Sequence, residues 1–545
     1  MSWQADRALA QARDAEARDQ WAAAQAAYAE ALTRWPEAAE LKLAFGLAAC
    51  RAGDFAAARS ALAAGVRARP TATEGWAALG QVCARTGDHA AACEALAQAV
   101  RLDPTAPALR VNHASMLRAL GDAAGARAEL EAALRLAPGD INARYNLANL
   151  LLDSGDEQGA VAAYQAVLTM APGHAGARYN LGCLARRRGD IEAALAWFEQ
   201  VVAQAPTHAD AWHNLAGCRR ALGDWDAARA AYERSVALED SARSRYALGT
   251  LDLLQGRWRP GWDGYEARWE ACGRTLPALP LPTWLGEAVP PGARLLVHAE
   301  QGYGDLLQFA RFLPGLRQRF ATVTVACPPA LLALLAASLD GIEVCDSLPD
   351  PADFTHAVAI MSLARVLHLD EAALGRYPVP YLRAPSGAQA GAERGPGLNV
   401  GLCWTGNPAQ SDNLWRSIPL GLLRGLRDIP GISWHNLQQG QAAQARAAGF
   451  ELRDASGQWR DFGDTAAYLA VLDLVITACT SIAHLAGGLG KPVWLLSRFD
   501  ADWRWLLDRQ DSPWYPSMRI WRQPTPGNWP AAVDKLDRAL RDLAR

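Results

Sequence analysis

Small and apolar residues recur with one constant step along the first half of the chain. Prolines stand 34 residues apart, at Pro36, Pro70, Pro104, Pro138, Pro172 and Pro206. Three further columns keep this step: the Gly-Asp pairs that begin at 53, 87, 121, 155, 189 and 223, the small residues Gly46, Gly80, Ala114, Ala148, Gly182 and Ala216, and the alanines Ala58, Ala92, Ala126, Ala160, Ala194 and Ala228. Small residues let two antiparallel helices pack closely, glycine ends the first helix, and proline closes the second. The pattern therefore predicts a stack of helical hairpins.

A different pattern begins near residue 294, where short apolar runs alternate with amphipathic segments. Runs of strand length lie at 295–299, 323–326, 342–345 and 356–360, and again at 398–404, 432–437, 474–477, 493–496 and 519–521. A polar, glycine-rich stretch at 384–397 separates the two sets. Such alternation predicts two doubly wound, Rossmann-like α/β lobes. The last segment, 530–545, is predicted to be an amphipathic helix, and a return of this helix to the first lobe is left open.

These patterns predict the domain organisation. Helical units are placed at 5–38, 39–72, 73–106, 107–140, 141–174, 175–208 and 209–242, and the first unit lacks the Gly-Asp pair. An eighth unit departs into the aromatic residues Trp258, Trp262, Tyr265 and Trp269, which are expected to cap the stack and dock it onto the next domain. We therefore predict an all-α solenoid at 1–276, a proline-rich linker at 277–293, a first lobe at 294–390 and a second lobe with a C-terminal helix at 398–545.

Composition narrows the class of protein. The apolar fraction of 51% and charged fraction of 20% fit a globular protein, and the net charge of -3 gives no electrostatic reason to expect nucleic acid. The first residues mix charges without an apolar core, and no apolar run of 18 residues occurs, so neither a signal peptide nor a membrane span is expected. The ten cysteines are scattered without metal-ligand spacing, so a reducing, cytoplasmic location and no metal are expected.

One stretch carries most of the candidate chemistry. Residues 294–309 read RLLVHAEQGYGDLLQF, an apolar strand, a glycine turn and the start of a helix. Glycines let a backbone approach a ligand, and a helix start offers free N–H groups. The stretch has neither the full G-x-G-x-x-G fingerprint nor the lysine of a phosphate-binding loop, which disfavours NAD and ATP. A plain strand-to-helix connection is the alternative interpretation.

Two resemblances give these patterns a function. The 34-residue period resembles the tetratricopeptide repeat. The stretches HAEQGYGDLLQF (298–309), VGLCWTGNPAQSDNLWRSIPL (400–420) and LVITACTSIAHLAGGLGKPVWLL (474–496), followed by DWRWLLDRQDSPWYPSMRIWRQ (502–523), resemble glycosyltransferases related to the lipopolysaccharide heptosyltransferases. The resemblance implies two facing lobes of the GT-B type and transfer of a sugar from a nucleotide sugar. The expected reaction inverts the configuration at the anomeric carbon of the sugar and needs neither a metal ion nor another cofactor.

The donor side is expected to bind a nucleotide diphosphate. Thr480 and Ser481 lie where a strand turns into a helix, and free N–H groups there suit a diphosphate. Arg416 would add a cation with bidentate geometry. His484 is included in the predicted donor site because the enzymes that the sequence resembles have a matching histidine there. A structural role in the helix–sheet core is the alternative. The full predicted donor set is Gly302, Gly304, Asn407, Arg416, Ser417, Gln438, Thr480, Ser481 and His484.

A catalytic base is expected in the first lobe. Asp305 ends the glycine turn, and an aspartate there could take the acceptor's proton, as the matching residue does in the related heptosyltransferases. The helix N-terminus is expected to keep this carboxylate ionised. A helix-capping aspartate is the alternative interpretation. His298 and Glu300 are rival bases in the same loop.

Four asparagines indicate how an acceptor is held. Asn112, Asn146, Asn180 and Asn214 stand at the sixth position of successive units, and only six asparagines occur in the repeats. An asparagine side chain both donates and accepts, so such a column can bind an extended peptide without reading its sequence. A similar ladder lies in the superhelix of O-GlcNAc transferase. Contacts with neighbouring helix ends or with solvent are the alternative.

Two motifs leave alternatives open. Relatives commonly have an acidic residue where this chain has Cys479, so an adaptor with an inactive transferase region is a second interpretation. A glycan or lipid acceptor is a third, which the asparagine column disfavours. The D-x-D pattern Asp500-Ala501-Asp502 matches a metal signature of another glycosyltransferase architecture, but we place it in a loop after the last helix-strand unit. The sugar, the base, the acceptor and homo-oligomerisation stay open.

Overall fold

The computed structural model describes residues 7–300, 302–389, 391, 393–407 and 413–545. It divides into two compact units, Met1–Pro206 and Thr207–Arg545, each of which is described by itself. The division falls inside the predicted solenoid, because the last helical hairpins share a core with the α/β lobes.

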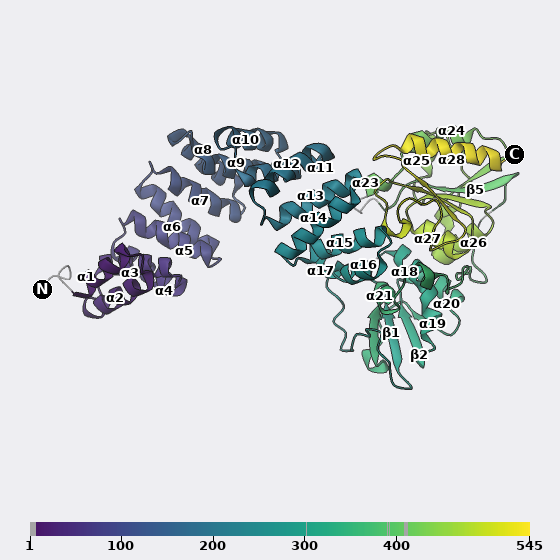
Figure 1. Cartoon of the computed structure of the whole chain (residues 1–545), viewed down its shortest axis with the longest axis horizontal. Helices are drawn as coiled ribbons and strands as arrows, with labels where there is room; N and C mark the ends of the chain where they lie inside the picture. Colours follow the sequence, from purple (N-terminus) through teal and green to yellow (C-terminus); the bar gives the residue numbers. More distant parts are fainter. Residues whose placement is uncertain (1–6, 301, 390, 392, 408–412) are drawn as a thin grey trace. The chain divides into compact units, whose positions relative to one another are not determined.

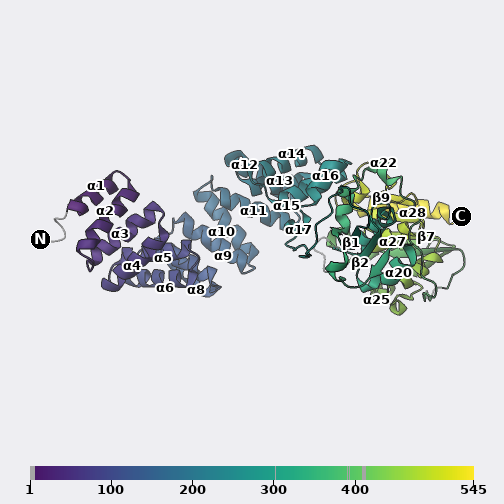
Figure 2. The same cartoon turned by 90° about the horizontal axis from the view of Figure 1, so that it is seen from below.

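The first unit consists of helical hairpins that follow one another along the chain (Figure 1; Figure 2). The hairpins confirm the stack that the 34-residue period predicts. Their helices are α1 (Arg7–Ala17), α2 (Trp21–Arg34), α3 (Ala39–Ala52), α4 (Phe55–Ala68), α5 (Thr73–Arg85), α6 (His89–Leu102), α7 (Pro107–Ala119), α8 (Ala123–Leu136), α9 (Ile141–Asp153), α10 (Glu157–Met170), α11 (Ala175–Arg187) and α12 (Ile191–Gln204).

Each Gly-Asp pair forms the turn inside a hairpin. The six glycines have φ between 80° and 88°, a left-handed conformation that glycine adopts without steric cost. The aspartate that follows each of them caps the next helix, as Asp156 does by accepting from the backbone N–H of Gly159 at 2.8 Å. The first hairpin keeps the turn without the pair, because Asp19, one period before Gly53, takes φ 57°.

The alanine column explains how the two helices of a hairpin pack. Ala58, Ala92, Ala126, Ala160, Ala194 and Ala228 are all 0% exposed. A methyl group is small enough for the opposing helix to approach closely, so one alanine per unit is buried at each helix contact.

The second unit begins with the remaining helices, α13 (Ala209–Leu222), α14 (Trp225–Leu238), α15 (Ala242–Leu254), α16 (Trp258–Tyr265) and α17 (Arg268–Ala271). Their aromatic residues dock onto the α/β region, as predicted, and contact both lobes. The ring of Trp262 lies 5.0 Å from that of Trp503 and 6.3 Å from that of Phe309, and its indole N–H donates to the carbonyl of Leu369. The end of the solenoid is therefore built into the core of the α/β region.

The first lobe is a parallel four-stranded sheet with the order β3-β2-β1-β4. Its strands are β1 (Arg294–His298), β2 (Thr322–Ala326), β3 (Glu343–Cys345) and β4 (His356–Ala359), and its helices are α18 (Tyr303–Phe309), α19 (Leu313–Leu316), α20 (Pro329–Ser338), α21 (Leu363–Val366) and α22 (Glu371–Leu374). Short 3₁₀ helices are η2 (Ala310–Phe312), η3 (Pro351–Asp353) and η4 (Ile360–Ser362). Part of the segment predicted as a linker belongs to this lobe, because Thr283 pairs with Ala357 and Trp284 is fully buried.

The second lobe is a parallel five-stranded sheet with the order β6-β5-β7-β8-β9. Its strands are β5 (Leu398–Cys403), β6 (Ile432–Asn436), β7 (Leu474–Ala478), β8 (Val493–Ser497) and β9 (Met518–Arg522). Its helices are α23 (Asn413–Arg416), α24 (Arg424–Arg427), α25 (Ala442–Ala447), α26 (Phe462–Ala470), α27 (Ser481–Gly488) and α28 (Trp529–Leu543), with the 3₁₀ helices η5 (Leu420–Leu423), η6 (Ser456–Gln458) and η7 (Trp503–Trp505). All nine predicted strands are present, in two separate parallel sheets.

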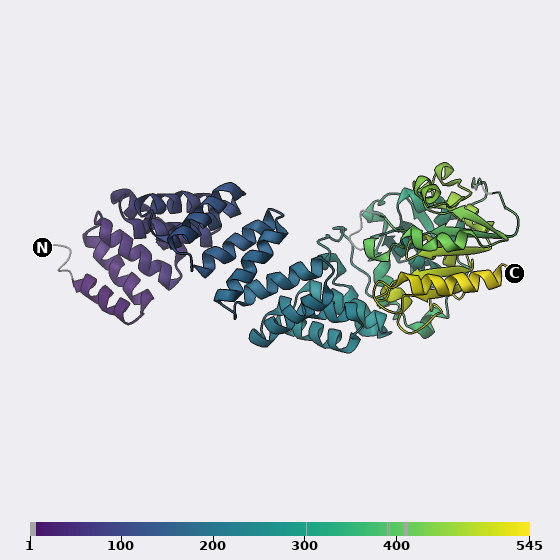
Figure 3. The same cartoon turned by 90° about the horizontal axis from the view of Figure 1, so that it is seen from above.

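The C-terminal helix stays on the second lobe. The apolar face of α28, formed by Val533, Leu536 and Leu540, packs on Leu423 and Leu426 and on the apolar face of the second sheet. In Figure 3 it is the yellow helix that runs beside the green elements of this lobe. A return to the first lobe, left open from the sequence, does not occur. The amphipathic pattern predicts that one face of the helix is buried, but it does not identify the surface on which that face packs.

None of the helices in the described residues is long and apolar enough to cross a membrane.

Two glycines near the same hairpin test the turn. A Cβ added at Gly155 or at Gly139 would meet no atom within 4 Å, but Gly155 has φ 83° and Gly139 does not have a positive φ. We expect Gly155→Ala to cost about 1–2 kcal/mol of unfolding free energy, since an L-residue is strained in the left-handed region. Gly139→Ala is expected to be neutral or stabilising by up to about 1 kcal/mol. Urea unfolding followed by circular dichroism measures both, and equal effects would contradict the role of the turn.

Candidate active site

The starts of two helices from different lobes lie side by side. Helix α18 follows β1 and helix α27 follows β7. A Cβ added at Gly304 would lie 2.9 Å from Cδ2 of His484 and 3.6 Å from Cα of Ser481, so the two backbones meet closely at this point. The predicted catalytic turn of the first lobe and the predicted donor-binding turn of the second lobe are thereby brought together.

Asp305 lies at this meeting point and is held by two donors. Its Oδ2 accepts from the backbone N–H of Gly302 at 3.0 Å, and its Oδ1 accepts from Nη2 of Arg504 at 2.5 Å. Burial raises the pKa of this carboxyl, while the Arg504 guanidinium and the Gly302 N–H oppose the rise. The helix N-terminus was expected to keep this carboxylate ionised, but the largest effect on its pKa is burial, which favours the neutral form. Capping and catalysis remain compatible, since one oxygen makes the capping contact.

The two rival bases occupy more closed positions. His298 is 5% exposed, and burial lowers the pKa of its imidazole. The carboxylate of Glu300 accepts from Arg268 at 2.7 Å and 3.0 Å and from the backbone N–H of Met361 at 2.8 Å. These contacts fix Glu300 as the partner of a buried arginine. The geometry favours Asp305 over either residue as a base.

Several predicted donor-site residues gather between the end of β5 and the start of α27. Thr480 caps α27, and its Oγ1 lies 3.2 Å from Oγ1 of Thr477 and 3.7 Å from Sγ of Cys403. The hydroxyl of Ser417 lies 2.6 Å from that of Thr405, whose backbone N–H donates to Gln438 at 3.1 Å. Ser481 is the first residue of α27.

Arg416 lies near Cys403 and Cys479 at the same end of the second sheet. The nearby positive charge of Arg416 opposes the rise that burial causes in the pKa of Cys403 and of Cys479. Its Nε donates to Oδ1 of Asn413 at 3.4 Å. Asn407 is exposed at the edge of the segment 408–412, which is outside the described residues.

His484 is enclosed rather than open to solvent. Its side chain is 4% exposed, its Nδ1 lies 2.9 Å from the hydroxyl of Tyr515, and its ring stacks on that of Trp505 at 5.5 Å. Burial lowers the pKa of His484 to about 3, so the imidazole is neutral near pH 7. It can serve as a hydrogen-bonding group but not as a cation for a diphosphate.

Cys479 occupies the position where the glycosyltransferases that the sequence resembles commonly have an acid. The indole N–H of Trp505 donates to its Sγ at 3.2 Å, and burial raises the pKa of the thiol to about 11. A neutral thiol therefore stands where a negative charge was expected, and the site lacks that charge at this position.

Arg504 is the residue that the sequence analysis missed. Its guanidinium donates to Asp305, to both oxygens of Asp502 at 2.9 Å and 3.1 Å, and to Oε1 of Gln308 at 2.6 Å. The signal was an arginine between tryptophans in DWRW, two residues after an aspartate. The D-x-D pattern was also misplaced, because its loop lies between β8 and β9 and not after the last helix-strand unit. Within the described residues, no group of three or more His, Cys, Asp or Glu side chains could hold a metal ion.

The asparagine column is not uniform. Asn112 and Asn146 are half-buried and make no side-chain hydrogen bond to the described part of the chain, while the Asn180 amide donates to the hydroxyl of Tyr164 at 2.9 Å and to Oδ1 of Asn149 at 3.0 Å. Asn214, in the second unit, departs from the expected accessible column. It is 1% exposed, and its Oδ1 accepts from Arg243 at 3.3 Å.

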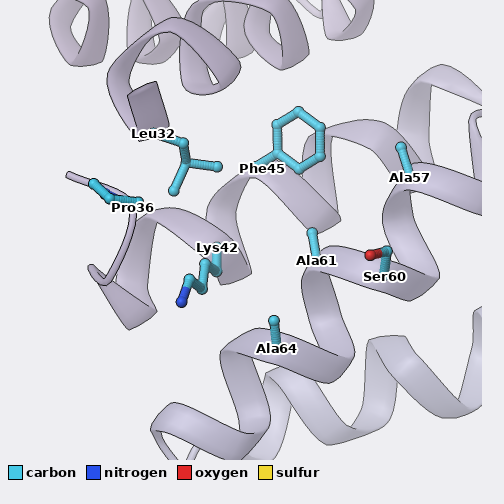
Figure 4. Close-up of a pocket in the computed structure, with 8 residues that line it drawn as sticks. All are labelled: Leu32, Pro36, Lys42, Phe45, Ala57, Ser60, Ala61 and Ala64. Carbon is cyan, nitrogen blue, oxygen red and sulfur yellow. The ribbon is translucent and has the colours of Figure 1, made fainter. Parts of the chain in front are cut away.

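Two pockets lie away from these residues. One of about 400 Å³ is in the first unit, and Figure 4 shows apolar side chains of α2, α3 and α4 around it with Lys42 at its edge; it is lined by Leu32, Pro36, Lys42, Phe45, Ala57, Ser60, Ala61 and Ala64. Another of about 270 Å³, in the second unit, is lined by Ala333, residues 385–388 and the start of α26. Neither is lined by Asp305, Thr480 or an asparagine of the column.

Comparisons with known families show the repeats. A profile described as the cytochrome c-type biogenesis protein H TPR domain matches residues 50–176, and a tetratricopeptide repeat profile matches residues 185–251. Residues 50–251 are therefore tetratricopeptide repeats, followed by an α/β region with parallel sheets.

Individual proteins are similar over part of the chain. Protein FlbA of Caulobacter vibrioides is 28% identical over 340 residues, which cover 56% of this chain and 56% of FlbA. YrrB, described as a TPR protein with an unusual peptide-binding site, matches 34% of this chain with 22% identity and a TM-score of 0.30 over 96% of its own length. A tetratricopeptide repeat protein from Parabacteroides merdae matches 44% with 18% identity and a TM-score of 0.37, over 94% of its length.

Two neighbouring glycines test the contact between α18 and α27. Gly304→Ala places a methyl group 2.9 Å from the His484 ring, whereas the nearest atom to a Cβ at Gly302 is an oxygen of Asp305 at 3.9 Å. We expect Gly304→Ala to destabilise the second unit by about 1–3 kcal/mol through overpacking. Gly302→Ala, at an exposed position, should change stability by less than about 0.5 kcal/mol. Thermal unfolding compares the two, and similar midpoints would show that the helices do not meet as described.

Proposed function

We propose that the chain is a glycosyltransferase that transfers a sugar from a nucleotide sugar to a protein acceptor held by the repeats. The observation that supports this proposal most is the meeting of α18 and α27. It places the carboxylate of Asp305 beside a helix start whose threonine, serine and neighbouring arginine suit a diphosphate. The proposal remains independent of the two pockets, since neither includes these residues.

In the proposed reaction each residue has one task. A nucleophilic group of the acceptor attacks the anomeric carbon of the sugar, its proton passes to Asp305, and the bond to the nucleotide diphosphate breaks with inversion. Arg416, Thr480 and Ser481 would stabilise the departing diphosphate through charge-assisted and hydroxyl contacts. No step requires a metal ion, because the cation and hydrogen-bond donors come from the chain.

The repeats would supply the acceptor. Tetratricopeptide arrays present a continuous surface formed by equivalent positions of successive units. Asn112 and Asn146 are half-buried, and their amide groups make no hydrogen bond within the described residues, so they can bond to a peptide. The Asn180 amide is held in place by the hydroxyl of Tyr164. These three side chains, rather than four, are therefore proposed to bind an extended polypeptide.

An adaptor with an inactive transferase region is a second candidate. Two observations favour it: Arg504 engages the proposed base at 2.5 Å, and a neutral Cys479 replaces the acid that relatives commonly have. The two candidates differ in whether a nucleotide sugar binds and turns over. A thermal-shift screen with UDP-, GDP-, ADP- and dTDP-sugars, followed by a hydrolysis assay on any stabilising compound, separates them. Binding without turnover supports the adaptor.

Asp305→Asn tests the base. The amide keeps an oxygen for Gly302 and a similar volume, so the fold and nucleotide binding should persist. Transfer should fall by about 10²-fold or more, the usual scale for a lost general base. Asp346→Asn, at an exposed position of the first lobe, is the matched control and should keep full activity. Normal turnover by a folded Asp305→Asn protein would exclude Asp305 and direct attention to His298.

The asparagine column predicts a cumulative effect on the acceptor. Each hydrogen bond is worth only about 0.5–1.5 kcal/mol, so a single Asn→Ala change should be almost silent. The triple change Asn112→Ala, Asn146→Ala and Asn180→Ala should raise the KM for a protein acceptor strongly and leave donor hydrolysis intact. Asn142→Ala, an exposed asparagine of α9 outside the column, is the control. Unaltered acceptor kinetics in the triple variant would make the column structural.

A further inference from the structure

The loop between β8 and β9 brings two charged side chains, Arg504 and Asp502, close to Asp305. Arg504 lies between two carboxylates, with Nη2 2.5 Å from Asp305 and Nη1 2.9 Å from Asp502. The side chains of Arg504, Asp305 and Asp502 are 7%, 16% and 35% exposed. Arg504 and Asp305 are largely removed from water, so their charges interact strongly and are weakly screened by salt.

The guanidinium is held in a fixed orientation. Its Nε donates at 2.6 Å to Gln308, which is fully buried on the same helix as Asp305. The ring of Trp503 lies under the guanidinium at 4.1 Å, and this ring packs against Trp262. Earlier in the loop, Phe499 stacks on Trp225 of α14 at 5.8 Å. Ring contacts at Phe499 and Trp503 therefore anchor the loop at two points ahead of Arg504.

The two aspartates of the D-x-D pattern face different arginines. Both oxygens of Asp502 accept from Nη1 of Arg504, whereas Asp500 pairs with Arg498 at 3.0 Å. A pair of carboxylates that holds a metal has to converge on one point. These two do not converge, so the pattern has another use here.

We propose that Arg504 is the positioning residue for Asp305, and that Asp502 works with it by setting the balance of charge around that carboxylate. The inference rests on the proposed function in that it makes Asp305 the base. Arg504 attracts the ionised form of Asp305 and aims its oxygen, while Asp502 repels that form and partly neutralises Arg504. Asp502 is thus a counter-charge and not a metal ligand.

The two partners act on Asp305 with opposite signs. The Arg504 charge lowers the pKa of Asp305 and the Asp502 charge raises it, against a larger rise from burial. Removing Arg504 therefore raises the pKa of Asp305, and removing the charge of Asp502 lowers it. Arg268 also lowers this pKa, and the other titratable groups that face or adjoin the carboxyl are Glu300, Tyr246, Tyr265 and His484.

The test is the dependence of kcat/KM on pH, because an ionised base gives an acidic limb at its own pKa. Arg504→Gln should move the limb to higher pH, and Asp502→Asn should move it to lower pH. Arg504→Lys keeps the charge and should hold the limb near its normal place. Arg498→Gln and Asp500→Asn change the neighbouring pair of the same loop and should leave the limb where it is. A purely structural role would move the limb in one direction or not at all.

A second measurement keeps this inference separate from the proposed function. Absence of turnover by the unmodified protein with any nucleotide sugar would overturn the proposed function. The carboxyl band of Asp305 can then be titrated by isotope-edited infrared spectroscopy, with Asp305→Asn identifying the band. Opposite shifts in Arg504→Gln and Asp502→Asn support the inference. Shifts of the same sign, or equal shifts in the Arg498 and Asp500 controls, overturn it. Thermal unfolding confirms that each variant is folded.

Discussion

A buried guanidinium must be met by hydrogen-bond acceptors, and two of the buried guanidinium groups of the α/β region tie together the loops around the candidate site. Arg268 is 1% exposed and joins Glu300 after β1 to Ser362 after β4, while Arg504 is 6% exposed and joins the β8–β9 loop to α18. Leaving either charge without its partner would cost about 3–5 kcal/mol. The geometry around Asp305 depends on this requirement more than on any single helix.

The same requirement bears on whether the region can be catalytic. A carboxylate offers about four lone-pair positions, and the described donors to Asp305 are one N–H and one guanidinium N–H. These two hydrogen bonds therefore leave lone pairs of the Asp305 carboxylate open to a proton from an acceptor. Cys479, in contrast, counts against catalysis. A thiol whose pKa is raised to about 11 cannot supply the negative charge of a carboxylate near pH 7.

The sequence predicted what depends on local spacing. The 34-residue period placed the hairpins, and runs of apolar residues placed all nine strands within about two residues, because period and run length are properties of adjacent positions. What it missed depends on partners distant in the chain. Arg504 is 199 residues from Asp305, Arg243 covers Asn214, and α28 packs on Leu423. Asn214 shares its register with Asn112, but register alone does not reveal which neighbour covers a side chain.

The last hairpins share a core with the first lobe, so only the hairpins before them can act as exchangeable modules. Ala216, Ala228 and Leu251 belong to the same buried cluster as Leu295 and Phe309, so repeats from Thr207 onward are structural parts of the α/β body. The hairpins before Pro206 bury their alanines within their own unit. We therefore expect that whole hairpins ahead of α13 can be exchanged, added or deleted without disturbing this core. A fusion point within the proline-rich segment 277–293 would instead separate elements of the unit that holds Asp305.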